Sequence, residues 1–211
     1  MALKQKTLHS TNKTSNSHPD FWDKAYIEGN TGWDIGTKTP IFDHWINSID
    51  KSKNICVLGA GNGWDAINFA QNGHKVTAVD FAPSAINSMI DRAKKNSVKM
   101  NIVQLNIFDL PKYYRFFFDV VVEYTCFCAI DPIDRQKYIE TVSGILKKSG
   151  LFVGILFPLD GKDIDSGPPF NVDLNETLNM FDKFLYRRKC EKSPHSIKPR
   201  KGREVFFIYE K

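Results

Sequence analysis

A glycine-rich turn between a buried β-strand and an α-helix constrains this chain more than any other feature. Residues 54–58 (NICVL) predict the strand, and residues 59–63 (GAGNG) follow at once, ahead of a helical pattern. Such glycines let a ligand approach the backbone and face the N-terminus of the helix. Asp80 stands 21 residues after Gly59, at the end of the next predicted strand, where its carboxylate can bind both hydroxyls of a ribose. Together these features predict a nucleotide-binding site.

The rest of the chain alternates short β-rich runs with helical ones, which predicts an α/β fold with a mainly parallel sheet covered on both faces. The expected strands are 54–58, 75–79, 101–105, 118–123 and 151–157, and the expected helices include 39–47, 83–95 and 132–148. Two last strands, at about 184–190 and 204–209, are expected to form an antiparallel finishing hairpin.

The length of 211 residues suits a single α/β domain. Residues 1–17 are rich in Ser, Thr, Asn and Lys and lack periodicity, so we expect a flexible N-terminal arm before a single domain over 18–211. From Pro19 the spacing predicts a short helix that Gly29 and Asn30 can end. Its apolar face would hold Phe21, Trp22, Ala25 and Tyr26.

Several classes of protein are disfavoured by what the sequence lacks. No run approaches the roughly 18 apolar residues that span a bilayer, and no apolar block follows the first lysines, so we expect neither a membrane protein nor a secreted one. The four cysteines form no C-x-x-C pair and have no histidine at zinc-finger spacing, which predicts no metal site and reduced thiols. We therefore expect a cytoplasmic protein.

The net charge of +5 is concentrated near the C-terminus, where residues 183–211 hold ten Lys or Arg against three Asp or Glu. Such a patch can attract nucleic acid or an anionic substrate. No stacking aromatic residues are interleaved where the charges are densest, at Lys198, Arg200, Lys201 and Arg203. A solvated charged edge is therefore the favoured interpretation, and nucleic acid is not an expected partner.

The spacing of the glycines separates the possible nucleotides. A dinucleotide site requires G-x-G-x-x-G, but this turn has G-x-G-x-G with Trp64 at the third position, and G-x-x-x-x-G-K-[ST] is absent. The pattern instead resembles that of S-adenosylmethionine-dependent methyltransferases, whose cofactor carries adenosine and a methionine moiety but no phosphate.

Further segments resemble the thiopurine methyltransferase superfamily and occur in the order found there. They are 22–26 (WDKAY), 32–36 (GWDIG), 106–110 (NIFDL), 127–132 (FCAIDP) with Arg135, and 167–170 (GPPF). The resemblance covers about Phe21 to Lys211. It implies a seven-stranded, Rossmann-like class I methyltransferase fold with a mostly parallel sheet, an antiparallel C-terminal strand and an N-terminal helical lid over the cofactor.

Position 124 separates the branches of this superfamily. Thiopurine enzymes resemble one another in a W-D-R tripeptide at the end of the fourth strand, whereas this chain has V-E-Y at 122–124. Tyr124 is similar to the tyrosine of the plant-type halide/thiol methyltransferases. The missing arginine argues against a thiopurine-like aromatic substrate. The glycine-rich turn also differs from that of many relatives at Ala60 and Asn62, but both residues should leave the backbone contacts of the turn with the cofactor intact.

The resemblance implies a set of cofactor-binding residues, although the residues alone leave alternatives open. The set is Trp22, Tyr26, Trp33, Gly59, Asp80, Asn106, Ile107 and Tyr124. Taken alone, the spacing of Trp22 and Tyr26 also suits a core stripe, and an ordinary turn also explains Asn106 and Ile107.

The other reactive side chains have plainer alternatives. We interpret Cys126 and Cys128 as buried bystanders, because methyl transfer needs no enzyme-bound intermediate. Arg135 could attract an anion, but a salt bridge on a helix surface is favoured. We assign no catalytic acid or base, although Tyr124 could orient the nucleophile.

The resemblance implies S-adenosylmethionine-dependent methyl transfer to a small soft nucleophile, such as a thiol, hydrosulfide, thiocyanate or halide. The transfer would be an in-line displacement in a desolvated aromatic pocket of a monomer, with a small-molecule or anionic acceptor. One alternative is a methyltransferase for thiopurines or for selenium or tellurium oxyanions. Another is a non-catalytic cofactor-binding or RNA-binding protein. The segment 123–126 (EYTC) lacks the N/D-P-P-Y/F motif of base-modifying methyltransferases, which favours a small substrate.

Overall fold

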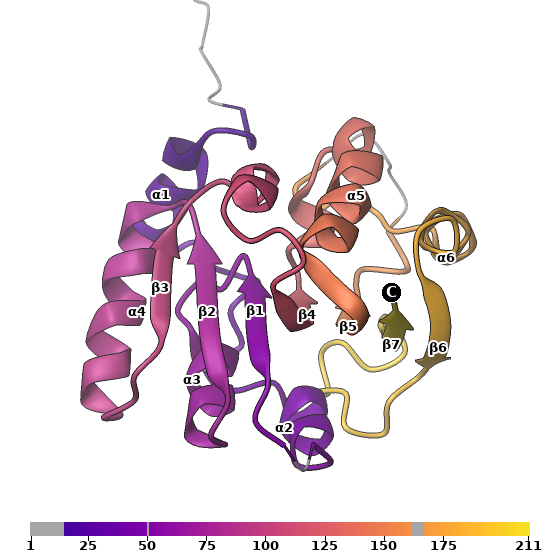
Figure 1. Cartoon of the computed structure of the whole chain (residues 1–211). Coiled ribbons are helices and arrows are strands. Elements are labelled where there is room, and N and C mark those ends of the chain that lie inside the picture. The colour runs from indigo at the N-terminus through magenta and orange to yellow at the C-terminus, as the bar shows by residue number, and fades with distance from the viewer. Residues whose placement is uncertain (1–14, 50, 162–166) are drawn as a thin grey trace, which may run out of the picture.

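The computed structural model describes residues 15–49, 51–161 and 167–211 and is built on a seven-stranded sheet with the order β3-β2-β1-β4-β5-β7-β6 (Figure 1). The strands are β1 (Asn54–Leu58), β2 (Lys75–Asp80), β3 (Asn101–Gln104), β4 (Phe118–Tyr124), β5 (Leu146–Leu156), β6 (Tyr186–Glu191) and β7 (Val205–Glu210). Strands β1 to β5 pair in parallel, and β7 is antiparallel to both β5 and β6. The expected seven-stranded, mostly parallel sheet with an antiparallel C-terminal strand is confirmed.

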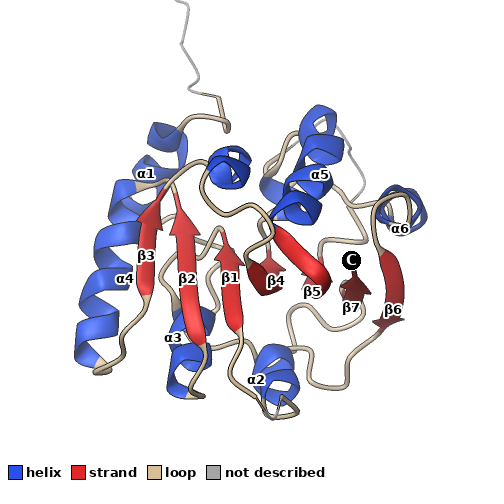
Figure 2. Ribbon diagram, viewed as in Figure 1, coloured by secondary structure: helices blue, strands red, loops and turns tan. Residues whose placement is uncertain are grey.

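Helices flank this sheet (Figure 2). The α-helices are α1 (Pro19–Ile27), α2 (Pro40–Ile46), α3 (Trp64–Gln71), α4 (Pro83–Lys95), α5 (Arg135–Ile145) and α6 (Leu174–Phe181). The short 3-10 helices are η1 (Ile107–Lys112), η2 (Phe127–Ala129) and η3 (Pro132–Asp134).

Successive residues of the central strands pack on opposite faces of the sheet, which produces two cores. In β1, Cys56 and Leu58 join the core that contains α5 and α6, whereas Ile55 and Val57 join the core that contains α2, α3 and α4. All four side chains are buried. This arrangement explains why the strand is continuously apolar, because neither of its faces meets water.

Most predicted elements match the structure closely. Residues 54–58 and 83–95 coincide with β1 and α4, and the finishing strands lie within two residues of their predicted positions. Helix α6 was not predicted, although Leu174, Leu178 and Phe181 have helical spacing and Asp173 caps the helix by accepting from the Glu176 N–H at 2.8 Å.

The prediction of one helix over 132–148 is wrong at its C-terminal end. Helix α5 ends at Ile145, and Leu146 begins β5 by pairing with Phe118 of β4. The backbone N–H groups of Phe116 and Phe117 donate to the carbonyls of Gly144 and Ile145. Because these contacts occupy the last helical carbonyls, the strand begins earlier than the apolar periodicity suggested.

Among the described residues, no helix combines the length and the apolarity needed to cross a bilayer.

Gly154 of β5 provides a test of the packing between β5 and β7. A Cβ added there would overlap the Phe207 ring and lie 3.0 Å from the Glu123 carbonyl oxygen. We expect Gly154→Ala to lower the free energy of unfolding by about 1–3 kcal/mol through overpacking. Urea denaturation measures this change.

Gly144→Ala is the matched control, since its Cβ would meet Pro111 at an ordinary 3.7 Å. Because Gly144 lies within a helix, Gly144→Ala should raise the free energy of unfolding by about 0.5–1 kcal/mol. Equal effects of the two variants would contradict the packing described for Gly154.

Candidate functional site

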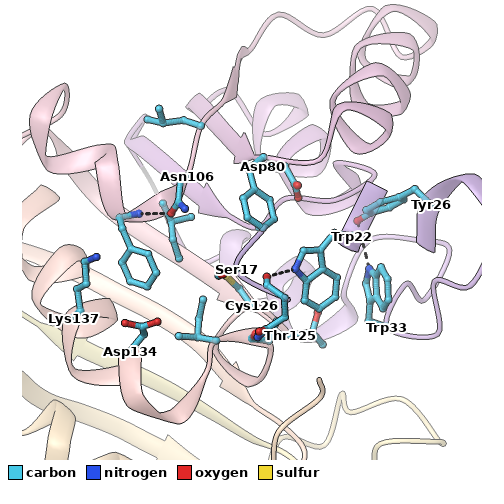
Figure 3. A pocket seen from close by; sticks show the side chains of 18 residues that line it. Ser17, Trp22, Tyr26, Trp33, Asp80, Asn106, Thr125, Cys126, Asp134 and Lys137 are labelled. Carbon is cyan, nitrogen blue, oxygen red and sulfur yellow. Dashed lines mark hydrogen bonds between the residues drawn. The ribbon is translucent and has the colours of Figure 1, made fainter. Parts of the chain in front are cut away.

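A cavity of about 310 Å³ opens beside the carboxyl ends of β1, β2, β3 and β4, where ligands of parallel α/β sheets commonly bind. Seven of the eight residues predicted to bind the cofactor line it: Trp22, Tyr26, Trp33, Gly59, Asp80, Asn106 and Ile107. In Figure 3 the rings of Trp22, Tyr26 and Trp33 gather at one end, and Asp134 and Lys137 lie at the other.

Asp80 joins the glycine-rich turn to the end of β2. Its Oδ2 accepts the Gly61 N–H at 2.9 Å, and its Oδ1 accepts the Ala82 N–H at 3.0 Å. Burial raises the pKa of Asp80, while the backbone donors favour its charged form. The carboxylate is therefore held rigidly at the cavity wall, with lone pairs left for a polar ligand.

Two glycines of the turn are required by close contacts as well as by their left-handed backbone. Gly59 and Gly61 have φ values of 55° and 54°. A Cβ at Gly61 would lie 2.9 Å from Tyr26 Oη, and one at Gly59 would lie 3.0 Å from Cys126 Sγ. Larger residues would push the lid or the cavity floor away from the turn.

Helix α1 forms the lid over this turn. Trp22 and Trp33 meet edge to face with centroids 5.3 Å apart, as do Tyr26 and Trp33 at 5.7 Å, and the Trp33 indole N–H donates to Tyr26 Oη at 3.4 Å. No residue of α1 is fully buried, so the alternative of a core stripe for Trp22 and Tyr26 is wrong. The expected N-terminal helix is confirmed, and its role as a lid over the cofactor stays a prediction.

The residues just before α1 also contribute to the cavity wall. Asn16 and Ser17 line the cavity, the Asn16 side chain donates to the Ala129 carbonyl at 3.0 Å, and the Asn16 carbonyl accepts the Trp22 indole N–H at 2.8 Å. The predicted arm ends at residue 17, but residues 1–14 lie outside the described ranges, so that boundary stays a prediction. Nothing in this polar segment indicated a role in the site.

The wall after β3 is apolar and begins with a capped turn. Asn106 Oδ1 accepts the Phe108 N–H at 3.0 Å and so caps η1. Ile107 and Phe108 then line the cavity together with Phe81. The ordinary turn considered for Asn106 and Ile107 therefore exists, and it also presents a flat apolar surface to a ligand.

Tyr124 is the exception among the predicted residues. It lines an adjoining, smaller cavity that shares Trp33, Gly59 and Thr125 with the larger one. Its hydroxyl donates to Glu204 at 2.6 Å, and burial together with the Glu204 charge raises its pKa. Tyr124 thus lines the smaller of two adjoining cavities, and its predicted role in surrounding the cofactor with the other seven residues stays a prediction.

The cysteines near the site are poor nucleophiles. Cys126 lines the larger cavity and Cys128 does not. Burial raises the pKa of Cys128 to about 12 and that of Cys126 well above its usual value, so both thiols stay protonated at neutral pH. This agrees with the interpretation of both as bystanders.

A buried carboxyl group, Glu123, was missed in the sequence. Its Oε2 accepts the Phe127 N–H at 3.0 Å, whereas its Oε1 and the nearby Tyr138 hydroxyl have no hydrogen-bond partner. Burial raises the pKa of Glu123 to about 7. Within the described ranges, no group of three or more His, Cys, Asp or Glu side chains could hold a metal ion.

Two arginines depart from their favoured interpretations. Lys198, Lys201 and Arg203 are exposed as predicted for a charged edge, but Arg200 is only 5% exposed. Arg135 is half-buried, donates to the Asn171 carbonyl at 3.0 Å and lies over the Phe127 ring, and within the described ranges the expected surface salt bridge is not found.

Comparison with known proteins gives consistent matches. The family model for thiopurine S-methyltransferase (TPMT) matches residues 17–208. The chain is 27% identical over 198 residues to thiocyanate methyltransferase 1 of Arabidopsis thaliana, and 27% over 209 residues to the probable thiol methyltransferase 2 of that species. Each alignment covers 90% of this chain and 84% of the relative.

The fold is similar to that of Burkholderia thailandensis 1,6-didemethyltoxoflavin-N1-methyltransferase, solved with 1,6-didemethyltoxoflavin and S-adenosylhomocysteine bound. The TM-score is 0.73 at 16% identity, over 99% of this chain and 93% of the other.

The raised pKa of Glu123 predicts a pH-dependent stability. Folding raises its pKa from 4.5 to about 7, so between these values the folded chain keeps a proton that the unfolded chain releases. The free energy of unfolding should therefore fall as pH rises through this window, by up to roughly 3 kcal/mol. Glu123→Gln should remove this part of the slope and stabilise the protein at pH 8.

Urea denaturation between pH 5 and 8 measures the effect. Glu140→Gln, at an exposed position of α5, is the matched control and should keep the wild-type slope. An unchanged slope in Glu123→Gln would mean that the carboxyl group is ionised in the folded protein.

Proposed function

The chain belongs to the thiopurine S-methyltransferase family, and we propose that it transfers a methyl group from S-adenosylmethionine to a small soft nucleophile such as a thiol, hydrosulfide, thiocyanate or halide. The observation that carries this proposal is the fixed Asp80 carboxylate facing a cavity under a roof of three aromatic rings. The named thiocyanate and thiol relatives support this acceptor class, as does Tyr124 at the position of an arginine in thiopurine enzymes.

The residues around the cavity fit S-adenosylmethionine. Each Asp80 oxygen already accepts one backbone N–H and has a further lone pair for a ribose hydroxyl. Ile107 and Phe81 offer apolar surface to an adenine ring. The faces of Trp22 and Trp33 suit a sulfonium, with an attraction of about 0.5–2 kcal/mol.

When bound, S-adenosylmethionine supplies an electrophilic methyl group, so that the acceptor's lone pair bonds to the methyl carbon as the carbon–sulfur pair returns to the sulfur. An anionic acceptor and the sulfonium cation give neutral products, so charge decreases towards the transition state. Water stabilises the charged reactants more than this transition state, and excluding water therefore favours the reaction. Trp22, Tyr26 and Trp33 exclude water, and the walls hold the reactants in line, which can lower the barrier by up to roughly 7–11 kcal/mol.

An acceptor that arrives ionised needs no general base, and the neutral Cys126 thiol is not required. The residues of this chain act by binding, orienting and desolvating the reactants.

A panel of acceptors tests the proposed reaction. Purified protein with S-adenosylmethionine should convert iodide to methyl iodide, hydrosulfide to methanethiol and thiocyanate to methyl thiocyanate, as measured by headspace gas chromatography. A thiopurine and selenite serve as competing acceptors. Faster turnover of either, or no turnover of any soft anion, would contradict the proposal.

Asp80→Asn tests the cofactor site separately. The amide keeps the size of the side chain but loses the charge that strengthens hydrogen bonds from hydroxyl groups. We expect the Kd for S-adenosylhomocysteine to rise about ten- to a hundredfold in calorimetry. Asp109→Asn, which removes an exposed carboxylate paired with Lys112, is the control and should leave the Kd unchanged. Equal affinities of wild type and Asp80→Asn would place the ribose elsewhere.

A further inference from the structure

Asp134 is a charged side chain at one end of the larger cavity that the proposed chemistry does not use. It lines the cavity and is half-buried. In Figure 3 it lies on the side of Asn106, away from the rings of Tyr26 and Trp33. Within the described ranges, no ion pair includes its carboxylate. The cavity therefore ends in a hydrogen-bond acceptor that no protein cation neutralises.

The position of Asp134 in the fold does not account for its carboxylate. It directly precedes α5, where an aspartate usually caps the helix by accepting a backbone N–H of the first turn. The Asp134 side chain makes no such bond. By contrast, Asp131 does cap the short helix η3, because its Oδ1 accepts the Ile133 N–H at 3.1 Å. The Asp134 carboxylate is thus left for a ligand.

The two cations that follow Asp134 in the chain engage other groups. Lys137 also lines the cavity, but its Nζ lies 4.4 Å from the centroid of the Phe108 ring. Arg135 donates to the Asn171 carbonyl. Neither cation forms an ion pair with Asp134 in the part of the chain that the structure describes. A donor from a ligand would therefore meet an acceptor that the protein leaves open.

The cavity wall beside Asp134 suits a flat aromatic base. Ile130 and Phe108 line the cavity at this end and are apolar. At the other end, Trp33 also lines the smaller cavity, and the sulfonium is proposed to bind under its ring. The ribose is proposed to bind Asp80 and joins these two parts of the cofactor. The adenine therefore extends toward Asp134.

We propose that Asp134 accepts a hydrogen bond from the adenine 6-amino group and so makes the cofactor site selective for this base. The amino group lies on the far side of the base from the ribose, and its N–H groups suit a carboxylate, which only accepts. Asn106 is less available, since its Oδ1 already accepts the Phe108 N–H. This inference rests on the cofactor placement in the proposed function.

The test combines two ligands with variants of the protein in calorimetry. The ligands are S-adenosylhomocysteine and its 6-deamino analogue, in which purine replaces adenine. Removal of the amino group should raise the Kd of the wild type about tenfold. Asp134→Ala should raise the Kd for S-adenosylhomocysteine about tenfold, but that for the deamino analogue less than threefold, roughly, because the bond is already lost. Asp134→Asn keeps an accepting oxygen and should retain part of the affinity.

Two further variants separate reading of the base from general effects on the site. Asp80→Asn should raise the Kd values of both ligands alike, because both carry the ribose. Glu140→Gln removes an exposed carboxylate from α5 and should change neither Kd. If Asp134→Ala weakens both ligands equally, or neither, the inference is overturned.

Asp134→Ala could also fail to fold, so a second measurement uses the wild-type protein. A crystal structure of its complex with S-adenosylhomocysteine should place the 6-amino nitrogen within about 3.2 Å of an Asp134 carboxylate oxygen. An adenine that faces other residues would overturn the inference. If the wild type binds S-adenosylhomocysteine but methylates no acceptor, the proposed function fails, while these affinities still decide the role of Asp134.

Discussion

The hydrogen bond from the Gly61 N–H to the Asp80 carboxylate is the interaction on which the rest of the site depends. It joins the turn after β1 to the end of β2, and the Ala82 N–H fixes the second oxygen. Because the carboxylate is already oriented and nearly dry, a ligand hydroxyl that binds it orders little that was free before. The same bond sets the position of the turn, and Tyr26 packs on that turn so closely that Gly61 cannot carry a side chain.

The lid is held by a small number of polar and aromatic contacts rather than by a core. No residue of α1 is fully buried, and its ties to the body include the Asp23 carboxylate, which accepts the Ser84 N–H at 2.6 Å, and the Trp22 indole, which donates to Asn16. Elements with little buried apolar surface open at low free-energy cost. Such a lid can exclude water when closed and still admit a cofactor.

Local patterns predicted the centre of the fold well, because β1 and α4 are determined by continuous apolar residues and by helical spacing within a single segment. Contacts between distant segments determine the features that local patterns did not predict. Leu146 was expected in a helix but pairs with Phe118, and Arg200 was expected in water but is covered by Tyr124 and Phe157. The charged run itself does not indicate which of its residues will be buried, since the rings that cover Arg200 come from distant segments, the end of β4 and the residue after β5.

Trp33 joins the two ends of the site, and this has a consequence for how the site closes. Its ring lines both cavities, its indole N–H donates to Tyr26 above the glycine-rich turn, and its carbonyl accepts from Arg200. Moving Trp33 breaks both hydrogen bonds, and the one from the charged guanidinium is worth about 1.5–3 kcal/mol. Trp33 therefore links the lid over the larger cavity to Arg200 beside the smaller cavity. In the proposed reaction, Trp33 would thus connect the residues that exclude water from the methyl donor to those around the smaller cavity.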